Sequence, residues 1–179
     1  MKALLALARG IDALNDRFAD FAKWAVLAAC LISAANAAVR YALDISSNAF
    51  LEIQWYLFAA VVMFGASQVL RVNEHVRVDV FYGHYPTRVK VVVDILGMLF
   101  FLIPVSALII YLSLPIFERM YDTKEMSSNA GGLIRWPVML TIPLGLSLLV
   151  LQALSEVIKR VGWLMHVHEM DMHYERPLQ

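Results

Sequence analysis

Two acidic residues, Glu52 and Asp94, stand inside otherwise apolar stretches of the sequence. A carboxylate in such a place could relay protons or couple an ion to transport, because an isolated charge in lipid is costly and is a functional candidate by default. Each lies about one helical turn from the end of its stretch, where water or an arginine can reach it. We therefore expect a structural ion pair or a partner contact at both residues, with a direct transport role as the second interpretation.

A run of mixed charge follows the second apolar stretch: Glu74-His75-Val76-Arg77-Val78-Asp79. Its charges alternate with valines, so the segment can pair its own ions and begin the next helix through Asp79. We interpret it as a structured connector between two helices. Its charged residues are structural or partner-contact candidates: Glu74, His75, Arg77 and Asp79.

The sequence lacks the patterns of common enzymes and metal sites. All five histidines fall outside the apolar stretches, which excludes a haem held by two histidines within a membrane. Cys30 is the single cysteine, so neither an intrachain disulfide nor a thiolate metal site can form. A phosphate-binding glycine loop, a nucleophile elbow and a zinc-protease helix are also missing. We expect no enzyme activity, no catalytic, substrate-binding or metal-binding residue, and no cofactor in this chain.

The composition indicates a protein that lipid covers to a large extent. Of the 179 residues, 60% are hydrophobic and 17% are charged, whereas a soluble domain has about 25% charged residues. The 15 basic and 15 acidic residues cancel, which argues against the basic face of a nucleic-acid-binding protein. Length and composition together predict a single membrane domain over residues 1–179.

Four windows are apolar enough, and long enough at about 20 residues, to cross a bilayer as helices. They cover residues 21–43, 51–70, 89–114 and 136–157. The sequence therefore predicts an all-α membrane protein with four transmembrane helices. Pro115 marks the expected end of the third span, whereas Pro104 and Pro143 lie inside spans and should each bend a helix.

Lysine and arginine are distributed unevenly between the two sides of this layout. Eleven fall on one side: Lys2, Arg9, Arg17, Lys23, Arg71, Arg77, Arg88, Lys90, Lys159, Arg160 and Arg176. Four fall on the other side: Arg40, Arg119, Lys124 and Arg135. Since positively charged segments stay in the cytoplasm, we expect both termini to be cytoplasmic.

Residues 1–20 predict an amphipathic helix ahead of the first span. Apolar residues recur every three or four positions from Leu4 to Phe18, while Asp12 and Asp16 occupy the other side. We interpret this helix as an anchor at the membrane surface, with docking to a partner as the alternative. We expect the first span to be retained rather than cleaved as a secretory signal, and residues 158–179 to form a cytoplasmic tail.

Small and weakly polar residues line one face of the first span and one face of the fourth. Asn36 joins a face of alanine and serine in the first span, and Gly145 and Gln152 share a face in the fourth. Such faces indicate close helix packing, because the hydrophobic effect does not drive helices together within lipid. We expect these residues to pack within the bundle or against a partner.

Several of these features together resemble a known family, the DctQ-type small membrane subunit of tripartite ATP-independent periplasmic (TRAP) transporters. The matching residues are Glu52 at the start of the second span, Gly65 in Phe64-Gly65-Ala66, the run from Glu74 to Asp79, Trp136-Pro137, and Ile142-Pro143-Leu144-Gly145. The resemblance covers roughly residues 20 to 160, and it makes Gly65, Trp136 and Pro143 further structural or partner-contact candidates. The N-terminal helix and the histidine-bearing tail lie outside the family pattern.

The resemblance implies a non-catalytic scaffold subunit in the bacterial inner membrane. In this family a much larger membrane subunit carries the substrate and sodium sites, and a periplasmic substrate-binding protein delivers an organic acid. The implied partners of this chain are therefore the large membrane subunit and the binding protein, in addition to membrane lipids.

A second interpretation of the sequence is an autonomous exporter or proton antiporter that works as a homodimer. In that case Glu52 would be the coupling acid. Such a mechanism needs a deep, titratable carboxylate, whereas Glu52 is placed near the end of its predicted span.

Overall fold

The computed structural model describes residues 1–45, 47–73, 82 and 84–169 of the chain. Its elements are α1 (Lys2–Leu43), α2 (Asn48–Arg71), α4 (Thr87–Gly97), the π-helical segment η1 (Met98–Leu102), α5 (Ile103–Asp122) and α6 (Trp136–Leu164). Since α4, η1 and α5 are continuous, the described residues form four helices that are long and apolar enough to cross a membrane. The predicted all-α fold with four spans is confirmed.

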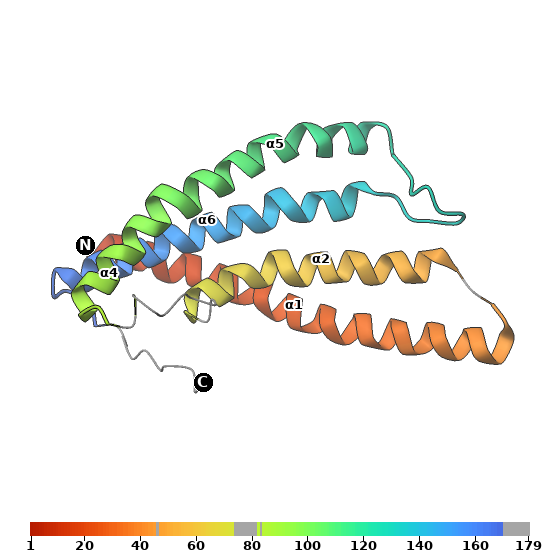
Figure 1. Ribbon diagram of the computed structural model, residues 1–179, viewed down its shortest axis with the longest axis horizontal. Helices are drawn as coiled ribbons and strands as arrows, with labels where there is room; N and C mark the ends of the chain where they lie inside the picture. Colours follow the sequence, from red (N-terminus) through yellow and green to blue (C-terminus); the bar gives the residue numbers. More distant parts are fainter. Residues whose placement is uncertain (46, 74–81, 83, 170–179) are drawn as a thin grey trace.

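The four long helices form an open layer (Figure 1). α1 packs against α2 and α6, α2 packs against α6, and α6 packs against α5. The helices converge at the end where α1 begins and α6 finishes, and they lie in the order α1, α2, α6, α5 at the opposite end. We call the first the network end. The second, which carries residues 44, 45, 47 and 123–135, we call the loop end.

Burial within the layer is sparse, because each helix has neighbours on only one or two sides. The buried apolar residues form two small clusters, one of Ala22, Ala60, Phe64 and Leu148 and the other of Leu70, Met98 and Ala153. Large side chains such as Trp24, Trp55 and Phe101 are exposed. Much apolar surface is thus left to face lipid or another protein.

α1 unites two elements that the sequence predicted separately. It is one helix of 42 residues, about 63 Å long at 1.5 Å per residue, which is about twice the thickness of a hydrocarbon core. The amphipathic helix predicted for residues 1–20 is therefore the first half of α1. Its apolar side is exposed at Leu4, Leu7 and Leu14. Its buried side instead carries Ala8, Asn15 and Ala19, because α6 and α2 supply partners for the polar groups there.

Two prolines inside spans are accommodated locally. η1 ends two residues before Pro104, and Ile103 N donates a hydrogen bond to Met98 O, five residues back. A π turn of this kind absorbs the break in the α-helical hydrogen bonds that a proline causes. Pro143 lies inside α6, which remains one α-helix from Trp136 to Leu164.

The helix of the third span continues past Pro115, where the sequence predicted the span to end. Pro115 lies inside α5, which continues to Asp122, so the helix itself does not end at this proline. The additional turns pack against the start of α6 through aromatic rings. Tyr121 and Trp136 lie with their ring centroids 5.4 Å apart in an edge-to-face arrangement, a geometry that stabilises aromatic pairs.

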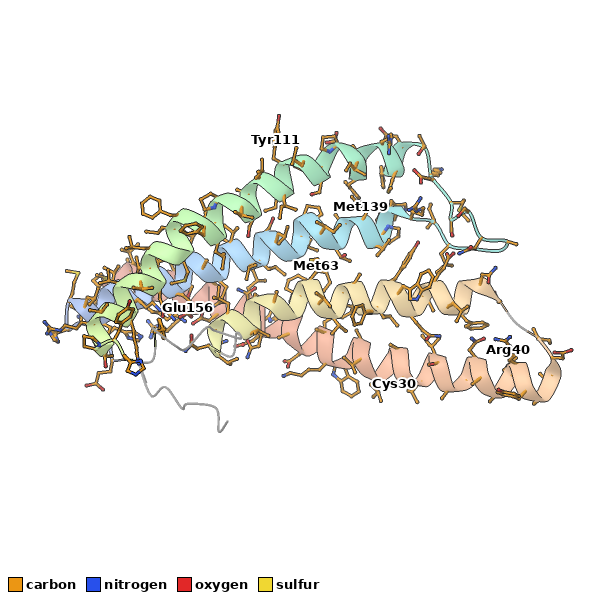
Figure 2. The ribbon with its side chains drawn as sticks, viewed as in Figure 1. Cys30, Arg40, Met63, Tyr111, Met139 and Glu156 are labelled. Carbon is orange, nitrogen blue, oxygen red and sulfur yellow. The ribbon has the colours of Figure 1, made fainter. Side chains whose placement is uncertain are left out.

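Gly145 sets the close approach of α2 and α6. A Cβ atom at this position would lie 2.6 Å from Met63 Cβ and 2.7 Å from Met63 O, on the facing side of α2 (Figure 2). Any larger residue would therefore push the two helices apart. Gly65 differs, because a Cβ atom there would meet nothing within 4 Å. Packing within the chain thus explains why position 145 is a glycine, but it does not explain the glycine at position 65.

Candidate functional site

A buried carboxylate, Glu52 of α2, organises the loop end. Glu52 is 3% exposed. Its Oε1 accepts hydrogen bonds from Ser127 Oγ and from Asn129 Nδ2 at 2.8 Å, and its Oε2 accepts one from Leu133 N at 2.6 Å. All three donors belong to the α5–α6 connection of residues 123–135. Together they satisfy a charge that would otherwise be costly to bury.

The α5–α6 connection folds closely around this carboxylate. Tyr56 Oη of α2 donates a hydrogen bond to Ile134 O at 3.0 Å. A Cβ atom on Gly132 would lie only 2.8 Å from Glu52 Oε1, so a side chain there would displace the carboxylate. The connection of residues 123–135 is therefore attached to α2, and through it α5 and α6 are attached to α2 at the loop end.

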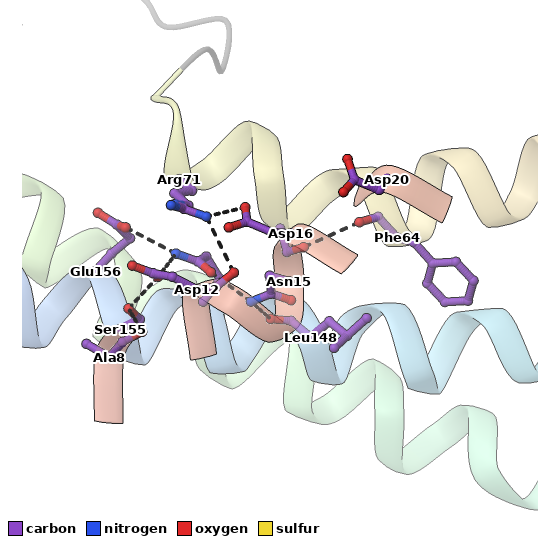
Figure 3. A network of polar contacts seen from close by, with 12 residues as sticks. Ala8, Asp12, Asn15, Asp16, Asp20, Phe64, Arg71, Leu148, Ser155 and Glu156 are labelled. Carbon is purple, nitrogen blue, oxygen red and sulfur yellow. Dashed lines mark hydrogen bonds and ion pairs between the residues drawn. The ribbon is translucent and has the colours of Figure 1, made fainter. Parts of the chain in front are cut away.

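A second polar cluster at the network end is centred on Asp12 of α1 (Figure 3). Asp12 Oδ1 accepts hydrogen bonds from Gln152 Nε2 at 2.9 Å and from Ser155 Oγ at 2.8 Å, and Asp12 Oδ2 pairs with Lys159 Nζ at 3.1 Å. The side chains of Asp12 and Lys159 are only 13% and 14% exposed. One carboxylate of α1 is thus bound by residues on successive turns of a single face of α6.

Neighbouring side chains extend this cluster to α2. Asn15 Nδ2 donates to Gln152 Oε1 at 2.7 Å, and both side chains are fully buried. Arg71, the last residue of α2, forms an ion pair with Asp16. Its guanidinium also donates to Asp12 O at 3.4 Å. α1 is therefore bound to α6 and to α2 by adjacent residues of the same two turns.

A chain of ion pairs continues the cluster toward α4. Glu156 pairs with both Lys159 and Arg160, and Figure 2 shows Glu156 near the network end. Arg160 Nε lies 3.5 Å from Asp94 Oδ2, and Tyr82 Oη donates to Asp94 Oδ1 at 3.0 Å. The buried acids therefore alternate with bases, which offsets the cost of removing each charge from water.

The chemistry of both clusters favours helix attachment. Asp12, Glu52 and Glu156 each accept two or more hydrogen bonds or ion pairs from other residues, as described above. Within the described ranges, His, Cys, Asp and Glu side chains form no group of three that could hold a metal ion. Acids engaged in this way fix the positions of neighbouring helices.

The structure places the predicted residues in three settings. Those in the polar clusters are Glu52, Asp94 and Gln152. Those on α6 that pack against a neighbouring helix or interrupt the helix are Trp136, Pro143 and Gly145. Those that contact neither cluster are Asn36 and Gly65. The charged residues of the inner connector lie outside the described residues: Glu74, His75, Arg77 and Asp79.

Several cluster residues were not predicted as site residues. Asp12 and Asn15 recur on one side of the first segment, and Gln152, Ser155 and Lys159 recur at similar spacing on the fourth span. These two polar stripes could have predicted the contact between the two helices, since the acid and amide of one stripe match the amide, hydroxyl and amine of the other. The loop donors Ser127 and Asn129 carry no comparable signal, because a polar loop is expected whether or not it binds an acid.

Four helices of spanning length, joined by buried polar contacts at both ends, define a multi-pass membrane protein. The family model for "Tripartite ATP-independent periplasmic transporters, DctQ component" matches residues 29–162. The chain belongs to this family and is a small membrane subunit of a TRAP transporter. Searches of curated proteins and of solved structures returned no match. The matched range includes Glu52 and the polar stripe of α6, whereas Asp12 and Asn15 precede it.

Replacing Glu52 by alanine should loosen the α5–α6 connection, because three donors lose their acceptor. Amide hydrogen exchange of the purified chain, followed by mass spectrometry, should be about tenfold faster over residues 123–135. Gln54→Ala is the matched control, since Gln54 Nε2 bonds only its own helix at Phe50 O. Unchanged exchange in Glu52→Ala would show that the connection does not depend on Glu52.

Replacing Asp12 by alanine should weaken the attachment of α1, because Lys159 stays largely buried after losing one of its two acids. We expect the free energy of unfolding in mixed micelles to fall by about 2 kcal/mol. The control is Asp20→Ala on the same helix, where the Asp20–Lys23 ion pair is exposed and contributes little. Equal effects of the two substitutions would contradict a structural role for the Asp12 cluster.

Proposed function

We propose that the chain is the scaffold of its transporter and packs against the large membrane subunit. In this proposal the large subunit carries the substrate and sodium sites and imports an organic acid, which a periplasmic substrate-binding protein delivers. The chain itself supplies no catalytic, substrate-binding or cofactor-binding residue. Its place is the bacterial inner membrane, surrounded by lipids and the large subunit.

This proposal rests on the hydrogen bonds that Glu52 accepts. Its two oxygens accept three hydrogen bonds from residues 123–135, so protonation of Glu52 would disturb the connection between α5 and α6. A coupling acid needs access to both protonation states during each cycle. The geometry therefore favours the scaffold over a homodimeric exporter or proton antiporter that works through Glu52.

The distribution of polar groups supports the same proposal. The two polar clusters occupy opposite ends of the layer, and between them the helices meet through Ala22, Ala60, Phe64 and Leu148. A substrate path would need polar partners across this middle zone, whereas apolar and small residues suit a rigid support. The uneven count of lysine and arginine supports placing the network end, with α1's start and α6's end, in the cytoplasm.

Purification of the tagged chain from its native host in mild detergent tests this proposal. We expect one much larger membrane protein to co-purify in constant ratio, and mass spectrometry identifies it. The chain purified alone and reconstituted in liposomes should neither bind nor take up organic acids.

A self-contained dimer with proton-dependent transport would contradict the scaffold proposal. The contradiction would be complete if Glu52→Gln abolished that transport without changing the amount of folded dimer. The matched control is Glu118→Gln, which makes the same change at an exposed acid on α5.

A further inference from the structure

The buried face of α1 continues toward the loop end, where this chain covers it only in part. On the network half of α1 this face carries Ala8, Asn15, Ala19, Ala22 and Ala25, all buried. Its continuation at helical spacing carries Ala29, Ser33, Asn36, Ala37 and Arg40, none of which is buried. The difference arises because α6 contacts α1 at the network end, whereas at the loop end α2 lies between them (Figure 1).

A groove lies along this uncovered face, between α1 and α2. Its volume is about 450 Å³, and its lining includes Ser33, Asn36, Ala37, Arg40, Leu51 and Gln54. Figure 2 shows Arg40 near the loop end of α1. Asn36 lies seven residues before Leu43, about 10 Å along the helix axis from the end of α1. The groove is therefore partly polar at a depth where the surrounding surface is apolar.

The polar groups of the groove lack partners within the described part of the chain. There, neither the Asn36 amide nor the Arg40 guanidinium has a hydrogen bond or an ion pair, and Gln54 uses only its Nε2, on Phe50 O at 2.9 Å. A carboxamide facing lipid leaves its donors and acceptor unsatisfied, which is unfavourable. Binding of a partner that forms hydrogen bonds with these groups would therefore be favourable.

Three occupants can be compared on these grounds. Acyl chains of lipids fill an apolar groove but offer nothing to Asn36 or Gln54. A second copy of this chain would share the same membrane orientation, so a two-fold interface through this face would bring both Arg40 side chains to the same level, where like charges repel. A helix of another membrane protein, with an acceptor near the loop end, satisfies all of these groups.

We propose that the α1–α2 groove receives one transmembrane helix of the large membrane subunit. This inference rests on the proposed function and adds the contact surface to it. The incoming helix hydrogen-bonds Asn36 and Gln54 and places a carboxylate or a carbonyl oxygen beside Arg40. Small side chains at Ser33 and Ala37 allow its backbone to approach closely.

Photo-crosslinking of the whole complex tests the proposal. A photoreactive phenylalanine derivative replaces Tyr41, an exposed aromatic residue that also lines the groove, so the groove stays open. The matched control is position Val39, which is exposed and about 160° away around the same helix. Irradiation of membranes from the native host should yield a product containing this chain and the large subunit from position 41, at least about tenfold more than from position 39.

Other products would overturn the proposal. A product of two copies of this chain from position 41 would identify a homodimer surface, and a product containing only lipid would identify a lipid groove. If the large subunit co-purifies with the unmodified chain but does not crosslink at position 41, the scaffold function stands and the groove assignment fails. If nothing co-purifies, the scaffold function itself fails.

Substitutions give an independent readout that does not depend on a crosslinker. Ala37→Phe fills the groove and should lower the amount of co-purified large subunit by about tenfold, which corresponds to a packing clash of about 1.4 kcal/mol. Ala35→Phe should leave it unchanged, and equal yields for the two variants would contradict the proposal. Arg40→Gln tests the acceptor at the loop end, since it removes the charge and keeps the groove open.

Discussion

Charged and polar groups that are buried between packed helices must find their partners within the protein, and this constraint shapes the whole layer. Burying apolar side chains does little to hold helices together when lipid is equally apolar. Asp12, Gln152 and Lys159 therefore contribute specific attachment between α1 and α6. Because such contacts need close approach, small residues such as Ala8 and Ser155 accompany them.

The same constraint accounts for the open shape. Polar contacts join the helices at the network end through the Asp12 cluster and at the loop end through Glu52, while the middle zone holds the small apolar cluster of Ala22, Ala60, Phe64 and Leu148. A layer attached at both ends keeps its helices in place and still leaves two broad apolar faces. The scaffold role proposed above would benefit from both properties, since a scaffold must stay rigid and offer a surface to its partner.

The sequence predicted the helices better than it predicted their contacts. Apolar windows and charge placement are local properties, so the four spans could be read directly. The sequence did not reveal that α1 is continuous, because the exposed apolar side of residues 1–20 resembles that of a surface anchor. Likewise, Gln152 could be recognised as a packing residue, but its partners Asp12 and Asn15 lie about 140 positions away and depend on how the helices are arranged. Glu52 illustrates the same limit, since its donors come from a loop without a distinctive pattern.

The central claim is that the buried acids of this chain hold helices and take no part in transport. Uptake of the transporter's substrate per assembled complex, measured in liposomes for the whole transporter carrying Glu52→Gln, tests this claim most directly. The account predicts uptake per assembled complex equal to that of the unmodified transporter, with any loss confined to the number of complexes. Fully assembled complexes that no longer transport would contradict it.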